Sequence, residues 1–373
     1  MGPVARWLKP SLSWLLPVTP VVLLLRYVLA PEAHVALFML AGLAIVPLAG
    51  WMGKATEHLA DRTGEGIGGL LNATFGNMAE LIIAIMALRE GLTGVVKASL
   101  TGSIIGNALL VLGASMLGGG LKYKTQTYNP AGARSRATTM TLAAIALVTP
   151  AVYHQLAGPA GPAREGALSL EISVVLLVTY ALSLLFSLHT HQPYFEKAAA
   201  EAGRLEAGGH ETWSVGRSLA LLAGATAIVS WLAEILVRSV EPAAEALGMT
   251  EIFVGVVIVA IVGNAAEHST AILMALEDRM DLSLGIAIGS SVQIALFAAP
   301  VLVFLSYVIG PAPMDLVFTP AEVVAVGLSV VIVGQVAEDG ESNWLEGVQL
   351  LAVYAILALM FYFLPEATAA ASE

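Results

Sequence analysis

Residues 76–80 read Gly-Asn-Met-Ala-Glu, and residues 263–267, 187 positions later, read Gly-Asn-Ala-Ala-Glu. Aligned without a gap over 32 residues from these starting points, the two copies share nine identities. Each copy places a carboxylate deep inside apolar sequence, where a charge is costly unless something binds it. Duplicated units of this kind are typical of transporters with internal repeats, so Glu80 and Glu267 are the first functional candidates.

The composition excludes a soluble protein. Hydrophobic residues make up 57% of the chain and charged residues only 12%, and the mean hydropathy is +0.82. A membrane helix needs about 20 predominantly apolar residues, and continuous rather than alternating apolar runs argue against a β-barrel. We therefore predict an all-α polytopic membrane protein with about eleven transmembrane helices. The expected stretches are 12–30, 36–53, 66–88, 95–118, 138–156, 168–188, 217–239, 252–275, 283–309, 320–337 and 344–364. The ninth contains Pro300 and is expected to kink.

The positive charges predict the orientation of the chain. If the first stretch is a retained helix and the N-terminus is cytoplasmic, twelve Lys and Arg residues lie on the cytoplasmic side and five on the other. This excess follows the positive-inside rule, so we expect the C-terminus to lie outside. We expect the membrane to be the plasma (inner) membrane of a prokaryote. The net charge of −11 provides no basic surface for nucleic acid. The lipid bilayer is the expected partner, and the oligomeric state is left open.

The second copy lies in the eighth predicted helix, five helices after the first copy in the third, and because five is odd the two copies cross the membrane in opposite senses. We expect an N-terminal segment with the first helix (1–34), a first five-helix repeat (35–189), a cytoplasmic linker helix (190–216), and a second, inverted five-helix repeat with a short tail (217–373). Inverted repeats place equivalent groups around a pseudo-two-fold axis in the membrane plane. Glu80 and Glu267 are therefore expected to meet near the bilayer centre.

The repeated unit supplies oxygen ligands. In each copy an Asn precedes the Glu by three residues, so amide and carboxylate share one helix face. The following stretch of each copy adds further polar groups in apolar surroundings. The expected metal ligands are Asn77, Glu80, Ser103, Asn264, Glu267, Ser290 and Gln293, and Asn107 and Ser291 lie beside them. Oxygen donors with two formal charges suit a hard divalent cation such as Ca²⁺, and the chain has no cysteine for a thiolate site. Glycines in the same stretches, among them Gly102, are expected to let the helices approach closely.

Charge balance suggests exchange rather than one-way passage. Two buried carboxylates cannot stay ionised and empty without a large penalty, but one divalent cation or two protons would neutralise them. We expect the proton pathway to include Glu80, Glu267 and His268, because imidazole titrates near neutral pH. Glu57 and Glu234 are expected to lie at opposite mouths of the path.

The motifs resemble the signature repeats of the calcium/proton exchanger family, within the cation/calcium exchanger superfamily. The matching segments are Leu-Leu-Asn-Ala-Thr-Phe-Gly-Asn-Met-Ala-Glu at 70–80, Gly-Asn-Ala-Ala-Glu-His at 263–268 and Gly-Ser-Ser-Val-Gln-Ile at 289–294. The resemblance covers essentially the whole eleven-span layout. It implies export of cytosolic Ca²⁺ driven by inward proton flow, with Ca²⁺ and H⁺ as substrates, no cofactor and no enzymatic activity. It also implies that Glu80 and Glu267 are the central ligands.

Several alternatives remain open at this level. A sodium/calcium exchanger, or an antiporter of another divalent cation such as Mn²⁺, would share the inverted architecture. A cation channel would also use midplane acids but would need no counter-ion. An intramembrane metalloprotease is disfavoured because no His-Glu-x-x-His motif is present. A second interpretation of Ser103, Ser290 and Gln293 is that they hydrogen-bond between helices and do not bind the ion. A second interpretation of His268 is that it only packs against its neighbours.

Overall fold

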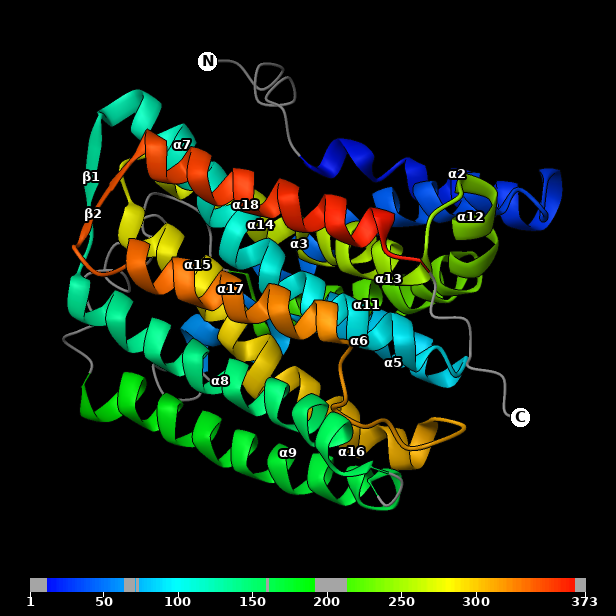
Figure 1. Ribbon diagram of the computed structural model, residues 1–373. Helices are drawn as coiled ribbons and strands as arrows, with labels where there is room; N and C mark the ends of the chain where they lie inside the picture. Colours follow the sequence, from blue (N-terminus) through cyan, green and yellow to red (C-terminus); the bar gives the residue numbers. More distant parts are fainter. Residues whose placement is uncertain (1–11, 64–70, 72–73, 159–160, 192–212, 366–373) are drawn as a thin grey trace, which may run out of the picture.

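The structure is a computed structural model that describes residues 12–63, 71, 74–158, 161–191 and 213–365. It is a bundle of long helices that run side by side, with two short strands at one end (Figure 1). The first half contains η1 (Leu12–Leu15), α2 (Val18–Leu24), η2 (Leu25–Leu29), α3 (His34–Thr63), α5 (Met78–Arg89), α6 (Thr93–Ile105), η3 (Gly106–Val111), α7 (Leu112–Tyr123), β1 (Thr125–Thr127), α8 (Pro130–Leu156), α9 (Pro162–Leu185) and η5 (Phe186–Thr190). The second half contains α11 (Val215–Arg238), α12 (Val240–Leu247), α13 (Glu251–Phe253), η7 (Val254–Val259), α14 (Ala260–Leu276), α15 (Met280–Gln293), η8 (Ile294–Ala298), α16 (Ala299–Ile309), α17 (Pro320–Val336), β2 (Glu341–Asn343) and α18 (Trp344–Phe363).

The helical, membrane-spanning character predicted from the sequence is confirmed. Within the described residues, eight helices are long and apolar enough to cross a membrane, and two shorter apolar helices cover Ser13–Leu29 and Pro320–Val336. In the predicted third stretch, 66–88, residues 71, 74 and 75 are helical, residues 76 and 77 form a turn and α5 follows, while 66–70, 72 and 73 lie outside the described residues. The total of eleven spans and the division into two repeats therefore stay predictions. The expected linker helix falls mostly on residues 192–212, which lie outside the described residues.

The region around Pro300 is continuous helix. A π-helical turn, η8, precedes it, and Pro300 occupies the first turn of α16. Proline lacks the N–H that would bond to the preceding turn of a continuous helix, and the wider π-helical turn lies just before it. At the position where the sequence predicts a kink, the structure has a wider, π-helical turn in η8.

The core of the bundle brings helices from both halves together. α3 packs along α11, α7 along α18, and α8 along α17. α14, which carries the second motif, contacts α3, α5, α6, α7 and α15. The close contact between α6 and η7 depends on Gly102, because a Cβ at this position would overlap the backbone carbonyl of Val256.

A two-stranded sheet, absent from the sequence prediction, closes one end of the bundle. β1 pairs with β2 in antiparallel register, with Gln126 opposite Ser342. The Gln126 side chain is buried, and its nitrogen donates to the Ala275 carbonyl and to Asp278 Oδ1, each at 2.9 Å. This sheet connects the end of α7 with the start of α18 and fastens both to the end of α14.

Next to the sheet, Tyr128 joins the start of α8 to the end of α17. Its buried hydroxyl donates to the Val336 carbonyl at 2.8 Å. Burial raises the pKa of Tyr128 above its ordinary value of 10.0, and the nearby carboxylates of Asp339 and Glu346 raise it further. The phenol is therefore neutral in the folded protein at physiological pH.

We expect Tyr128→Phe to lower the free energy of unfolding by about 1 kcal/mol, because the Val336 carbonyl loses its donor. The raised pKa also means that the unfolded chain ionises first, so the stabilisation from this group is present below about pH 10 and is lost above it. Thermal unfolding measured from pH 7 to 11 would show both effects. The matched change Tyr307→Phe removes a hydroxyl from a side chain that is 50% exposed and should leave the unfolding temperature unchanged. Equal unfolding temperatures for the wild type and Tyr128→Phe would contradict the prediction.

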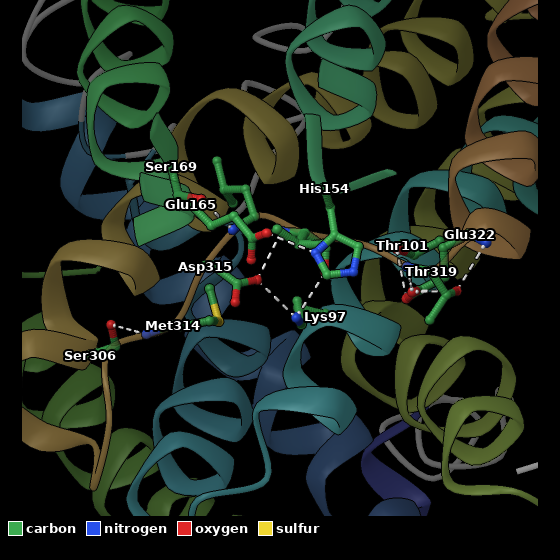
Figure 2. Close-up of polar contacts among 12 residues, drawn as sticks. Lys97, Thr101, His154, Glu165, Ser169, Ser306, Met314, Asp315, Thr319 and Glu322 are labelled. Atoms are coloured by element: carbon green, nitrogen blue, oxygen red, sulfur yellow. Dashed lines mark hydrogen bonds and ion pairs between the residues drawn. The ribbon is translucent and has the colours of Figure 1, made fainter. Parts of the chain in front are cut away.

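The connection from α16 to α17 is an extended segment held by side chains (Figure 2). From 314 to 319 its residues alternate: Met314, Leu316 and Phe318 are buried and the residues between them are partly exposed. Ser306 Oγ accepts from the Met314 amide at 2.7 Å, and Ser169 Oγ accepts from the Leu316 amide at 2.9 Å. Buried serines thus replace the partner strand that such a backbone would otherwise need.

The extended segment is also fastened to α6. The Lys97 ammonium donates to Asp315 Oδ1 at 3.0 Å and to the Val317 carbonyl at 2.8 Å (Figure 2). One turn after Lys97 on α6, the Thr101 hydroxyl donates to Glu322 Oε1 at 3.2 Å. Glu322 is buried and forms a capping box with Thr319 at the start of α17. These bonds hold α6, the helix that carries Ser103, at two positions.

Candidate ion-binding site

The first motif stands at the beginning of a helix. Asn77 is the N-cap residue of α5, and Glu80 lies in its first turn. The Asn77 side chain makes no capping hydrogen bond, so its amide is available to other groups. The helix N-terminus carries a partial positive charge that favours a carboxylate in the first turn.

The second motif stands inside a helix. Asn264 and Glu267 are on α14, directly after the π-helical turn η7, and the chain stays helical through both. π-helical turns are frequent at functional sites because they shift the side chains that follow. The two copies of the motif thus present the same groups from different local backbones.

The two glutamates meet at the Asn77 amide. A carboxylate oxygen is an acceptor, so we assign the amide with its nitrogen toward the acids. This nitrogen then lies 3.0 Å from Glu80 Oε2, 3.0 Å from Glu267 Oε1 and 3.0 Å from Ser290 Oγ. The other amide atom lies 2.6 Å from the Gln293 side chain. One amide from the first half therefore contacts the carboxylates of both halves.

Each of the two serines contacts the asparagine of the other half. Ser290 on α15 contacts Asn77 of the other half. Ser103 on α6 accepts from Asn264 Nδ2 at 2.8 Å and donates to Glu80 Oε1 at 2.9 Å. Every residue that the sequence predicts as a metal ligand is thus in this cluster, on α5, α6, α14 and α15. We refer to Asn77, Glu80, Ser103, Asn264, Glu267, Ser290 and Gln293 as the central cluster.

The two carboxylates have unequal partners. Both oxygens of Glu80 accept a hydrogen bond, one from Ser103 and one from Asn77. Glu267 Oε2 is buried and has no hydrogen-bond partner among the residues that the structure describes. An unpartnered buried carboxylate oxygen is costly, and a proton or a cation would satisfy it.

Space for the first glutamate comes from a glycine of the second motif. A Cβ at position 263 would lie 2.9 Å from Glu80 Cγ. The glycine that opens the second repeat therefore lets the Glu80 side chain cross against α14. This contact is a physical reason for Gly at the start of the second motif.

The side chains of the central cluster supply mainly oxygen donors. Across the described residues, no group of three or more His, Cys, Asp and Glu side chains gathers to hold a metal ion. Two carboxylates with neutral amide and hydroxyl oxygens instead match the ligands that Ca²⁺ prefers in flexible coordination. This chemistry suits an ion that binds and leaves.

His268 lies at the edge of the central cluster and contacts Asn107. Its Nε2 is 3.0 Å from Asn107 Oδ1, and Asn107 Nδ2 donates to Asn264 Oδ1 at 3.2 Å. Asn107 is buried, lies beside the predicted ligands, and has no amide counterpart in the second copy, where Ile294 stands. The sequence signal that points to it is an amide in apolar surroundings four residues after Ser103.

The two remaining acids lie away from the central cluster. Glu57 is exposed near the end of α3. Glu234 is 41% exposed and pairs with Arg238 on the same helix at 2.9 Å, and Arg238 also contacts Glu90 at 3.1 Å. The structure does not bring either side chain to the two central glutamates.

The chain is similar to known ion exchangers over most of its length. The family model described as "Sodium/calcium exchanger protein" matches residues 33–189 and 217–363. The chain is 48% identical over 339 residues to a Ca(2+)/H(+) antiporter of Synechocystis sp., which covers 88% of this chain and 91% of that protein. It is 46% identical over 329 residues to the Ca(2+)/H(+) antiporter ChaA of Bacillus subtilis, with 88% and 92% covered. The solved structure of native YfkE matches the fold with a TM-score of 0.81 at 41% identity, covering 95% of this chain and 99% of that one.

Proposed function

The chain belongs to the sodium/calcium exchanger protein family, and we propose that within this family it exchanges cytosolic Ca²⁺ for external protons. The relatives that are 46% to 48% identical are Ca(2+)/H(+) antiporters, which supports protons as the counter-ion. The runner-up function is exchange of Ca²⁺ for sodium, or of Mn²⁺ for protons. The chain is a transporter and not an enzyme, in keeping with its family.

One observation carries the proposal: the carboxylates of Glu80 and Glu267 both reach the Asn77 amide nitrogen at 3.0 Å. Two ionised carboxylates this close repel each other, and burial increases the cost. A single Ca²⁺ neutralises both acids, and two protons do the same. The central cluster is therefore electrically neutral with either one Ca²⁺ or two protons bound, and its ionised, empty state is high in free energy.

Exchange follows if the cluster opens to one side of the membrane at a time. With the N-terminus in the cytoplasm, Ca²⁺ enters from inside, binds Glu80 and Glu267, and leaves to the outside. Protonation of the acids from outside then permits the return, and the cost of the empty cluster suppresses a return without a load. In this scheme α5, α6, α14 and α15 hold the ion, and the other helices form the wall against which access changes. We place the protein in a prokaryotic plasma membrane with its C-terminus outside.

The proton route in this proposal runs through the central glutamates and past His268. Glu57, at the end of α3 that is expected to face the cytoplasm, and Glu234, toward the outer end of α11, are assigned to the two mouths. The exposure of Glu57 and the partial exposure of Glu234 are compatible with these places.

The proposal is tested by Ca²⁺ uptake into proteoliposomes that contain the purified chain, with an imposed pH gradient and no sodium. We expect uptake that scales with the pH gradient and stops when an ionophore dissipates it. Uptake that needs a sodium gradient would replace the proposal with sodium/calcium exchange. Calcium flux without any counter-ion gradient would mean a channel, and competition by Mn²⁺ in the same assay would report the cation selectivity.

A further inference from the structure

The direction of every hydrogen bond around Asn264 is set by one backbone carbonyl. Asn264 Nδ2 lies 2.8 Å from the carbonyl oxygen of Ala260. A carbonyl only accepts, so the amide nitrogen of Asn264 must face it. The amide oxygen of Asn264 therefore points the other way, toward Asn107, and needs a donor there.

This constraint fixes the orientation of Asn107. Its nitrogen must face Asn264 Oδ1, which is 3.2 Å away. Its oxygen must then face His268 Nε2 at 3.0 Å, so this ring nitrogen carries a hydrogen. Both ends of the buried Asn107 amide are engaged, and neither is directed at the two glutamates.

The orientation of Asn264 also determines the hydrogen bond that Glu80 receives. Ser103 Oγ accepts from Asn264 Nδ2 at 2.8 Å, so its own hydrogen is available. That hydrogen points to Glu80 Oε1 at 2.9 Å. Hydrogen bonds that all run in the same donor-to-acceptor direction thus lead from His268 through Asn107, Asn264 and Ser103 to Glu80.

The second half has no counterpart of Asn107 and His268 at the aligned positions, and there the Gln293 side chain, from the neighbouring position, contacts the Asn77 amide. The position equivalent to Asn107 is Ile294, and the position equivalent to His268 is Leu81. In keeping with this, Glu267 keeps a buried oxygen without a partner among the described residues. The inverted repeat is therefore chemically unequal at its centre.

We propose that Asn107 is a positioning residue of the exchange site. It holds Asn264 so that the Ser103 hydroxyl donates to Glu80, and it holds His268 with its hydrogen on Nε2. Asn107 does not bind the cation. Its place in the π-helical turn η3 lets it bridge α14 at two points four residues apart. The role in transport rests on the proposed function, whereas the effect on His268 does not.

The test compares Asn107→Ala and Asn107→Asp with the wild type in two measurements. The first is the ring tautomer, read by solid-state NMR from ¹³C,¹⁵N-labelled histidine in proteoliposomes. The chain has seven histidines, and the His268 signal is identified by its loss in His268→Gln. The second is the KM and maximal rate of Ca²⁺ uptake under a pH gradient.

We expect Asn107→Ala to abolish the exclusive Nε2–H signal of His268 and to raise the KM for Ca²⁺ about tenfold, because it leaves buried partners unpaired. Asn107→Asp keeps an acceptor for His268 but has no donor for Asn264. It should therefore retain the Nε2–H signal while the KM rises about tenfold. The maximal rate should change less than the KM in both variants.

The matched control is Ser115→Ala. It removes a buried hydroxyl on the adjoining helix α7 that has no hydrogen-bond partner within the described part of the chain, and it should behave as the wild type. An unchanged His268 signal in Asn107→Ala, or a KM within twofold of the wild type in both variants, overturns the proposal. If Asn107→Ala does not fold, the retained signal and raised KM of Asn107→Asp decide alone. Wild-type uptake that requires sodium would refute proton exchange, and the NMR comparison would still decide whether Asn107 orients His268.

Discussion

Replacing either Glu80 or Glu267 with glutamine is expected to reduce pH-driven Ca²⁺ uptake to the level of empty liposomes. Glutamine has the shape of glutamate but no charge, so a single carboxylate would face a divalent cation that the cluster neutralises with two. The amide also adds an N–H group where the cation or the Asn77 nitrogen needs an acceptor. Each variant should still fold, because removing one of two close, buried like charges relieves repulsion.

The measurement is uptake of radioactive Ca²⁺ into proteoliposomes, with folding checked by size-exclusion chromatography and by the unfolding temperature. Glu245→Gln is the matched control, since Glu245 is exposed on α12, away from the central cluster, and it should transport normally. Transport at the wild-type rate by either central variant would refute the assignment of both acids to the ion site.

Among the glycines that the structure describes, Gly102 is the one where an added methyl group is expected to have the largest effect, as in Gly102→Ala. The new Cβ would overlap the backbone carbonyl of Val256, and a backbone atom cannot move aside as a flexible side chain can. Overpacking of this kind costs about 1–3 kcal/mol or more. The displacement would separate α6 from η7, one residue away from Ser103, so transport should fall along with stability.

Gly94→Ala is the control for this change, because it lies on the same helix and a Cβ there meets no atom within 4 Å among the described residues. It should leave the unfolding temperature unchanged or raise it slightly, since alanine favours a helix. Equal unfolding temperatures and equal uptake for the two alanine variants would show that α6 and η7 are not held at the distance seen here.

Much of the fold could be predicted because membrane helices follow from local composition. The predicted stretches 320–337 and 344–364 agree with α17 and α18 to within one residue at each end. The duplicated motif predicted which acids are central, because equivalent positions of a repeat occupy equivalent places. The structure brings Glu80 and Glu267 to one amide, Asn77.

The parts that could not be predicted depend on contacts between distant segments. Asn107 contacts His268, 161 residues away, and no repetition in the sequence indicates that pair. β1 and β2 are three residues long and polar, so they carry no strand pattern of their own. Glu234 precedes Arg238 by four residues, a spacing that allows an ion pair on a helix, but the exposure of that pair depends on which face of α11 packs against the bundle.

The extended segment between α16 and α17 has a consequence for how this connection tolerates changes in length. Loops between membrane helices commonly accept inserted residues. Here the side chains alternate with a period of two, and the Met314 and Leu316 amides each depend on a serine from a different helix. One inserted residue would exchange the inward and outward sets along the segment and would remove Asp315 from Lys97. An epitope tag is therefore expected to be accepted at the exposed residues 311–313 and rejected two or three positions later, so residues 314–319 are the part of this connection whose length is fixed.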